Sequence, residues 1–376
     1  MDFRLYFRSR QSEIVQQLKQ LVTLESPTQD KKAVDACAAF VAREFRKVGC
    51  KITTYPQTDT GDLTVAEFAP GRLREADDEI LVLAHLDTVW PVGKIVQMPF
   101  YVQGSRIYGP GVLDMKAGVA MLLSALRALH GLNIKPQKRI TVFFNAAEET
   151  GSEASTELIR KLARRASLVL CLEPALPGGA LKLERKGQVV VRLDVRGRSA
   201  HGGTPEKGIN AIEELAAQIA RFKRLRIRET TVNIGLAGGG DKANVVAERA
   251  WAVLDVRFWK AADRDRVLRL LRESPPALHG ARMRVSVEST TPPMEKTRAS
   301  EKLFLRAQEI AAGLGLTLKG GRTGGGSDAS FAAGLGVPTL DGLGPDGDGI
   351  HAENEHLLLP SLVERTALLT ELLKAL

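Results

Sequence analysis

The sequence has no long uninterrupted run of apolar residues. All of its apolar stretches fall short of the ~18 residues that a membrane-spanning helix requires, so we expect no membrane partner. The first ten residues, from Met1 to Arg10, carry charge but lack the apolar segment of a secretory signal. A cytoplasmic location is therefore the expectation.

Cysteine and aromatic residues are also scarce. The three cysteines, Cys37, Cys50 and Cys171, do not have the spacing of a disulfide framework or of a zinc ribbon. The formal net charge is +9, but few aromatic residues lie among the basic ones, which disfavours a nucleic-acid partner. The charge fits a solvated basic surface or attraction of an anionic substrate. Many basic residues are scattered, and others lie on predicted helix faces, namely Arg221, Lys223, Arg224, Arg226 and Arg228.

The first half of the chain alternates buried strands with amphipathic helices. With 376 residues, the chain is long enough for about two domains. Unbroken apolar runs predict strands, and apolar residues at helical spacing predict helices between them. The pattern indicates an α/β fold with a mostly parallel central sheet and helices on both faces. The predicted strands are 80–84, 139–144 and 168–172, and the helices are 11–24, 31–48, 117–129 and 153–165.

The pattern changes near Leu183, after which apolar and polar residues begin to alternate. The order strand, helix, strand, strand, helix, strand predicts a smaller α+β domain with a four-stranded antiparallel sheet and two helices. Features of the first domain return afterwards, with a helix at 300–314, a strand at 336–340 and a helix at 361–375. We therefore predict a discontinuous domain of residues 1–184 and 293–376, into which residues 185–292 are inserted.

Potential metal ligands follow several strands of the predicted main sheet. His85 and Asp87 come directly after the first buried strand. The carboxyl ends of parallel strands meet at one edge of a sheet, where α/β proteins bind their ligands. The other ligands expected at this edge are Glu148, Glu149, Glu173, His351 and, from a glycine-rich loop, Asp114.

So many carboxylates at one edge would repel one another unless a cation neutralised them. Two imidazoles with several carboxylates suit zinc, with cobalt or manganese as alternatives. The number of ligands favours two ions, which in dinuclear hydrolytic sites lie ~3.5–4 Å apart. Taken singly, His85 could be a structural histidine, Glu148 and Glu149 a helix start, and Asp114 a helix cap. Their joint order, each after a buried run, favours a metal site.

A series of motifs, in this order, makes the chain resemble a known superfamily. The sequence is similar to the zinc-dependent exopeptidases, in their carboxypeptidase and aminoacylase group, and most resembles the glutamate carboxypeptidase branch. The resemblance covers essentially the whole chain. The motifs are AHLDTV at 84–89, GPGVLDMKAG at 109–118, NAAEETG at 145–151, CLEP at 171–174, SAHGG at 199–203, and RTGGGSD at 322–328 leading to GIHAEN at 349–354.

The resemblance implies a role for each predicted ligand. His85 and Glu173 would bind one zinc, His351 and Glu149 would bind the other, and Asp114 would bridge the two. Glu148 would be the general base for a zinc-bridged water, and Asp87 would orient His85 through its carboxylate. The resemblance also implies a cis peptide bond between Asp114 and Met115.

The inserted segment resembles a lid and dimerisation domain, which implies a homodimer. By this resemblance, His201 reaches the active site of the partner subunit and stabilises an oxyanion, while Asn244 and Arg257 contact the substrate. Without the resemblance they would read as a turn histidine, a turn asparagine and a strand-edge arginine. Gly325 and Gly326 would let the backbone approach the ligand closely. No Lys followed by Ser or Thr comes after them, so a nucleotide loop is not expected.

The alternative for the glycine run is a plain loop leading into a helix capped by Ser327 or Asp328.

These inferences predict a hydrolase that cleaves an amide or peptide bond next to a free carboxylate, in a small peptide or an N-acyl amino acid. The alternatives are an N-acyl-amino-acid deacylase, a dipeptidase with the same chemistry, or a metal-binding protein without catalysis, which the intact Glu148 disfavours. Some glutamate carboxypeptidases have a further basic residue just after the last lid strand. Residues 290–294 here read TTPPM, which leaves the substrate side chain open.

Overall fold

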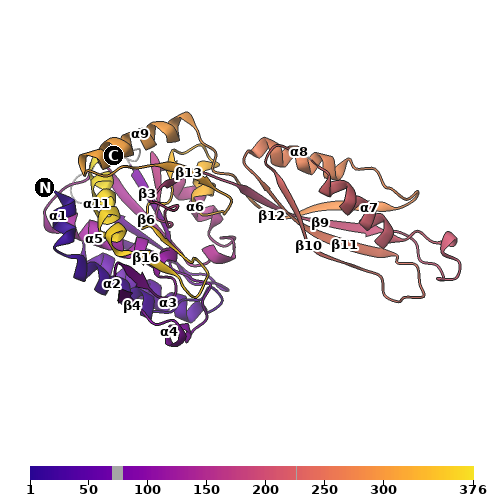
Figure 1. Cartoon of the computed structure of the whole chain (residues 1–376), viewed down its shortest axis with the longest axis horizontal. Coiled ribbons are helices and arrows are strands. Elements are labelled where there is room, and N and C mark those ends of the chain that lie inside the picture. Colours follow the sequence, from indigo (N-terminus) through magenta and orange to yellow (C-terminus); the bar gives the residue numbers. More distant parts are fainter. Residues whose placement is uncertain (70–78, 226) are drawn as a thin grey trace. The chain divides into compact units, whose positions relative to one another are not determined.

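The computed structural model describes residues 1–69, 79–225 and 227–376 (Figure 1). Arg226, one of the basic residues predicted to lie on helix faces, lies outside the described residues. The chain divides into two compact units. The first unit comprises Met1–Leu183, Lys296–Arg322 and Ser327–Leu376, and the second comprises Glu184–Glu295 and Thr323–Gly326.

A six-stranded sheet forms the centre of the first unit. Its order is β1-β2-β6-β3-β7-β14, and the pairs β6–β3, β3–β7 and β7–β14 are parallel. Every residue of β3 is buried, as the unbroken apolar run predicts. The mostly parallel sheet is thereby confirmed. The strands are β1 Lys51–Tyr55, β2 Leu63–Phe68, β3 Glu79–His85, β6 Arg139–Asn145, β7 Leu168–Cys171 and β14 Thr339–Leu340.

Helices pack against this sheet and against one another. Helix α5 is apolar on nearly all sides, which is why it lies in the core between α2 and α11. Helix α3 packs on β1 and β2, and α9 packs against α11 and β14. The helices are α2 Gln11–Thr23, α3 Lys31–Lys47, α5 Ala117–Gly131, α6 Thr156–Ala163, α9 Arg298–Gly313 and α11 Leu359–Ala375.

Some elements of the first unit differ from the sequence predictions. Strand β14 is shorter than the predicted 336–340, because Gly336 has a φ of 83° and Pro338 has no amide to donate. The short helix α1 (Phe3–Arg8) and a second, four-stranded sheet were not predicted. The strands of that sheet have two or three residues, too few for a periodic pattern. They are β4 Tyr101–Gln103, β5 Arg106–Tyr108, β15 Gly347–Asp348 and β16 His356–Leu358.

The second unit has the predicted four-stranded antiparallel sheet with two helices. The strand order is β10-β11-β9-β12, and alternate residues of β9 are buried, so that one face of the sheet forms a core with α7 and α8. Thr290 and Thr291 belong to β12 and do not follow it, which corrects the reading of that stretch. The elements are β9 Gly187–Arg196, α7 Ala211–Lys223, β10 Thr231–Gly239, β11 Arg249–Phe258, α8 Ala261–Arg272 and β12 Arg282–Thr291.

The loop Thr323–Gly326 groups with the second unit, whereas the predicted boundary assigns it to the first. The guanidinium groups of Arg185 and Arg257 donate hydrogen bonds to its carbonyl groups. In the described part of the chain, no helix is long and apolar enough to cross a membrane.

Candidate metal centre

His85, the last residue of β3, is buried and its ring orientation is fixed. Its Nδ1 lies 2.9 Å from the main-chain carbonyl oxygen of Asp87, so Nδ1 carries the proton and donates it. When the ring is neutral, the Nε2 atom therefore presents its lone pair to the cluster. It lies 3.2 Å from Oδ1 of Asp114 and 3.6 Å from Oε1 of Glu173. This is the tautomer that a metal-binding imidazole requires.

Asp114 lies between the two predicted histidine ligands. One of its carboxylate oxygens, Oδ1, faces Nε2 of His85, and the other, Oδ2, lies 3.5 Å from Nε2 of His351. The bond between Asp114 and Met115 is a cis peptide. A carboxylate with one oxygen toward each imidazole has the geometry of a bridging ligand.

Glu148 and Glu149 lie on a short 3-10 turn, η2 (Glu148–Thr150), directly after β6. The carboxylate of Asp87 accepts hydrogen bonds from the main-chain amides of both glutamates, each at 3.1 Å. The hydroxyl group of Thr28 donates to the same carboxylate at 2.8 Å. Oδ1 of Asp87 also lies 3.5 Å from Nδ1 of His85. Asp87 therefore contacts the His85 ring through its main-chain carbonyl and its carboxylate, and the carboxylate also holds the turn that carries the two glutamates.

The side chains converge in two overlapping groups that could each hold a cation. Ligand atoms of His85, Glu148 and Glu173 all lie within 4.8 Å of one another, and so do those of His85, Asp114 and Glu149. His351 reaches Glu149, with Nε2 3.1 Å from Oε2. Imidazole nitrogens with carboxylate oxygens are a donor set that suits zinc and similar divalent ions. The residues present thus fit a pair of such ions.

Comparison with known proteins agrees with this geometry. The sequence profile of peptidase family M20/M25/M40 matches residues 81–375. The chain belongs to this family.

Two relatives of this M20-family chain cover most of its length. Carboxypeptidase G2 from Pseudomonas sp. (strain RS-16) is 30% identical over 366 residues, which cover 94% of this chain and 87% of that protein. Succinyl-diaminopimelate desuccinylase from Methylobacterium radiotolerans is 28% identical over 297 residues, 73% of this chain and 74% of that protein. Membership in this family and these relatives identify the chain as a hydrolase, and the predicted resemblance is confirmed.

Solved structures share the fold of this M20-family hydrolase. Aminopeptidase PepT from Bacillus cereus superposes with a TM-score of 0.82 at 24% identity and covers 97% of this chain and 98% of that one. The YXEP protein from Bacillus subtilis, described as a dinuclear metal-binding peptidase of the M20 family, has a TM-score of 0.74 at 17% identity, with 97% and 98% covered. The fold class is therefore confirmed.

Several side chains of this candidate metal centre have strongly shifted pKa values. Desolvation, together with the charge of Glu173, holds the pKa of Glu148 well above its usual value. The carboxylates of Asp114 and Glu149 raise the pKa of His351 to about 10. Burial lowers the pKa of His85, but hydrogen bonds to Asp114 and Asp87 outweigh it and bring that pKa well above the usual value. When no metal is bound, these shifts favour the protonated form of both histidines.

This protonation predicts that metal binding releases protons. At pH 7.5 we expect about two protons to leave per chain as zinc binds, one from each histidine, because a metal-bound imidazole must be neutral. Since protons compete with the metal, zinc affinity should rise with pH up to the histidine pKa, which is about 10 for His351. Calorimetric titration with zinc in buffers of different ionisation enthalpy measures the number of protons released per chain. Release of no proton would contradict the protonated state of both histidines.

The same pKa shift affects the stability of the metal-free M20 hydrolase. Because the folded pKa of His351 is raised above its ordinary value of 6.5, protonation of His351 stabilises the fold fully below about pH 6.5. That contribution is lost as the pH rises through about 10. His351 is about half exposed, so solvent screens its ion pairs and keeps the contribution small.

Glu355 is a buried residue of this site that the sequence patterns did not reveal. Its carboxylate accepts hydrogen bonds from the main-chain amides of Gly111, Leu113 and Asp114 at 2.8–3.1 Å, and from the indole of Trp90 at 3.0 Å. It thereby ties the loop that carries Asp114 to its own loop, which carries His351. The only sequence signal was one more acidic residue close to His351.

Asp328 has a similar supporting role. It accepts hydrogen bonds from the side chains of Asn145 and Ser152, which flank the turn bearing Glu148 and Glu149. Asp328 makes no hydrogen bond as a helix cap, and the hydroxyl group of Ser327 donates to Asp341. A short helix (Ala329–Ala333) does follow the glycine run with Asp328 at its N-cap position, as the alternative expects, but without a side-chain cap hydrogen bond.

The remaining predicted site residues lie in the second unit. His201 accepts a hydrogen bond at Nδ1 from the amide of Gly203 at 3.0 Å, so the proton of the neutral ring is on the exposed Nε2. The stretch around Asn244 pairs with that around His201, with a bond of 2.8 Å from the amide of Gly202 to the carbonyl of Asn244. These two residues are neighbours in the structure although 43 positions separate them in the sequence.

Arg257 and the glycine run are in contact within this unit. Nε and Nη2 of Arg257 bind the carboxylate of Asp255, and Nη1 donates to the carbonyl of Gly324 at 3.2 Å. The carbonyl groups of Gly325 and Gly326 accept from Arg185, at 3.2 and 2.5 Å. The guanidinium of Arg257 is therefore held in place by Asp255.

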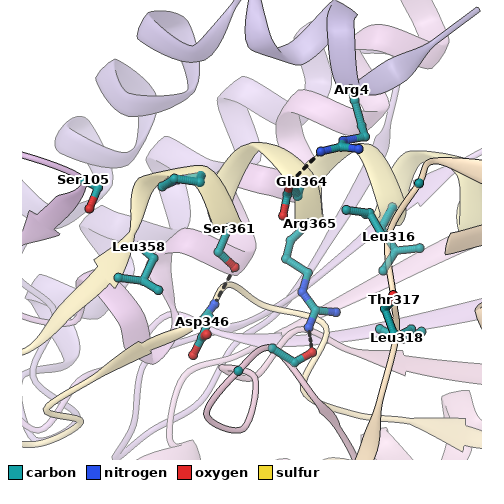
Figure 2. A pocket seen from close by; sticks show the side chains of 15 residues that line it. Arg4, Ser105, Leu316, Thr317, Leu318, Asp346, Leu358, Ser361, Glu364 and Arg365 are labelled. Carbon is teal, nitrogen blue, oxygen red and sulfur yellow. Dashed lines mark hydrogen bonds and ion pairs between the residues drawn. The ribbon is translucent and has the colours of Figure 1, made fainter. Parts of the chain in front are cut away.

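A cavity of about 370 Å³ also lies in the first unit, beside the beginning of α11 (Figure 2). Arg365 points into the loop at Gly179 and donates to its carbonyl group, and Arg4 pairs with Glu364 at 2.8 Å. Burial lowers the pKa of Arg365 to about 10. No predicted site residue lines this cavity, so it is distinct from the metal centre.

Proposed function

We propose that this M20-family hydrolase is a dinuclear zinc exopeptidase of the glutamate-carboxypeptidase type. It would cleave an amide or peptide bond next to a free carboxylate. The observation that carries the proposal is Asp114, whose two carboxylate oxygens face two different histidines, each with a glutamate beside it. One ion would be held by His85 and Glu173 and the other by His351 and Glu149.

When bound, the two cations supply Lewis acidity, which polarises the substrate carbonyl and makes water a nucleophile near neutral pH. The chain supplies the proton transfers. Glu148 would take the proton of the attacking water and give it to the leaving amine. Its raised pKa in the metal-free site supports this role, because a base with a pKa closer to neutrality can both accept and donate the proton.

His201 would stabilise the oxyanion of the tetrahedral intermediate in the partner subunit of a homodimer formed through the second unit. The proton on its exposed Nε2 supports the role, since an oxyanion needs a hydrogen-bond donor. Asn244, the neighbour of His201, would contact the substrate in the same region. His201→Ala should lower kcat more than it changes KM.

The free carboxylate of the substrate would bind at Arg257 and at the backbone of Gly325 and Gly326. Asp255 fixes one edge of the Arg257 guanidinium, which reduces the conformational freedom lost when a carboxylate binds. The carbonyls of both glycines turn toward Arg185. The carboxypeptidase relative, which matches 94% of this chain, favours a peptide-like substrate.

The second candidate function is deacylation of an N-acyl amino acid. It is favoured by the desuccinylase relative and by acetylornithine deacetylase from Klebsiella pneumoniae, 26% identical over 58% of this chain and 59% of that protein. Both functions share the chemistry and differ in the group on the acyl side.

A hydrolysis panel distinguishes them. Zinc-loaded protein is incubated with N-acyl amino acids, dipeptides and folate-like α- and γ-glutamates, each beside its carboxamide analogue. We expect cleavage of at least one acylated glutamate, loss of turnover with the carboxamide, and loss of all activity on chelation, restored by zinc. Preference for simple N-acyl amino acids would favour the deacylase, and turnover that survives complete metal removal would refute the mechanism.

A further inference from the structure

Lys182 is a buried cation next to the metal centre. It lies on β8 (Leu181–Arg185) in the first unit and is only 6% exposed. Its Nζ lies 3.6 Å from Oε2 of Glu173, a predicted zinc ligand. Lysine is rarely buried to this degree without a partner that needs its charge. A lysine beside a metal ligand therefore requires an explanation.

The two carboxylate oxygens of Glu173 face different partners. Oε1 lies 3.6 Å from Nε2 of His85, on the side of the cluster, whereas Oε2 faces Lys182. A carboxylate can bind a divalent ion through one oxygen or through both. An ammonium group at Oε2 competes with the cation for that oxygen.

Contacts of its backbone hold Lys182 next to Glu173. Its amide donates to the carbonyl of Asp341 at 2.8 Å. A Cβ at the next residue, Gly342, would lie 3.1 Å from the amide nitrogen of Lys182 and 3.3 Å from its Cγ, so a side chain there would crowd the lysine. Gly342 also has a φ of 77°, which favours glycine. The close approach of the two segments thus fixes the lysine beside Glu173.

We propose that Lys182 is a positioning residue that restricts Glu173 to one-oxygen coordination and withdraws part of its negative charge. This inference rests on the proposed metal centre. The ion held by His85 and Glu173 then receives less charge from its ligands. Such an ion binds less tightly but is a stronger Lewis acid toward the substrate carbonyl.

The test is Lys182→Met, which keeps much of the side-chain length and removes the charge. Metal-free protein is titrated with zinc against a chelating dye, which yields two binding constants without any substrate. We expect one of the two ions to bind about tenfold more tightly, because the substitution removes a positive charge that repels the cation. At saturating zinc, kcat should fall about tenfold with a smaller change in KM. Lys182→Arg, which keeps the charge, should restore both values.

A matched control removes another lysine–carboxylate contact. Lys31 pairs with Asp62 and, at 3.0 Å, with Asp35, and none of these three is a predicted site residue. Lys31→Met should change neither zinc constant nor kcat. A cooperative thermal unfolding transition shows whether each metal-free variant is folded. If Lys182→Met does not fold, Lys182→Gln takes its place.

Two results would overturn the proposal. Zinc constants that stay the same or weaken in Lys182→Met would show that the lysine does not restrain Glu173. A raised KM with unchanged zinc constants would show instead that Lys182 contacts the substrate. Neither result bears on the proposed hydrolysis, which fails separately if wild-type protein binds zinc but cleaves nothing in the panel.

Discussion

Glu148→Gln should lower kcat by about 10³-fold, within the range that general acid–base catalysis contributes. Glutamine has the same shape but cannot accept a proton from the attacking water or return one to the leaving amine. The main-chain amide of Glu148 still donates to Asp87, so the turn stays in place. The measurement is kcat with the best substrate of the panel at saturating zinc, with metal content determined in parallel.

The control for this variant is Glu153→Gln, at an exposed position just after the same turn. It should retain wild-type activity. If Glu148→Gln keeps full turnover in a zinc-loaded preparation, the proton-transfer role of Glu148 is refuted. If the variant instead loses an ion, Glu148 acts as a ligand, as its proximity to His85 and Glu173 would also allow.

Asp114→Asn should have the largest effect on metal content. An amide presents one oxygen, so it cannot offer an anionic oxygen to both His85 and His351 as the carboxylate does. We expect bound zinc to fall from two ions to one or fewer. The value of kcat/KM should fall by at least about 10³-fold, because the metal supplies several kcal/mol of transition-state stabilisation.

Elemental analysis after gel filtration in micromolar zinc measures this prediction. Asp59→Asn, which changes an exposed aspartate, is the control and should keep both ions. Full occupancy of two ions in Asp114→Asn would exclude Asp114 as the bridge. The amide hydrogen bonds of the loop to Glu355 do not involve the Asp114 side chain, so the variant is expected to fold.

The main sheet, and the places of the predicted ligands at its edge, could be predicted from the sequence because they depend on short-range patterns. The run before His85 is apolar without alternation, which identifies a doubly buried strand, and parallel strands bring their carboxyl ends to one edge. The same reasoning placed Glu148, Glu149 and Glu173. The alternation in β9 likewise revealed a sheet with one buried face.

The support behind the ligands could not be predicted, because it depends on contacts between distant segments. Glu355 lies 241 to 244 positions after the amides it accepts, and Asp328 lies 183 positions after Asn145. No local pattern shows that Lys182 faces Glu173 and not the solvent. The carbonyl of Asp87, which fixes the tautomer of His85, belongs to the main chain and has no residue preference.

The hydrogen bonds that hold the ligand loops run largely to main-chain amides, from the carboxylates of Asp87 and Glu355. The scaffold is thus built independently of the reactive side chains. Chemically inert variants such as Glu148→Gln should therefore retain the shape of the binding site and can capture an intact substrate. Such a variant can be incubated with a mixture of acylated amino acids. Mass spectrometry of the compounds that it retains would then identify the natural substrate.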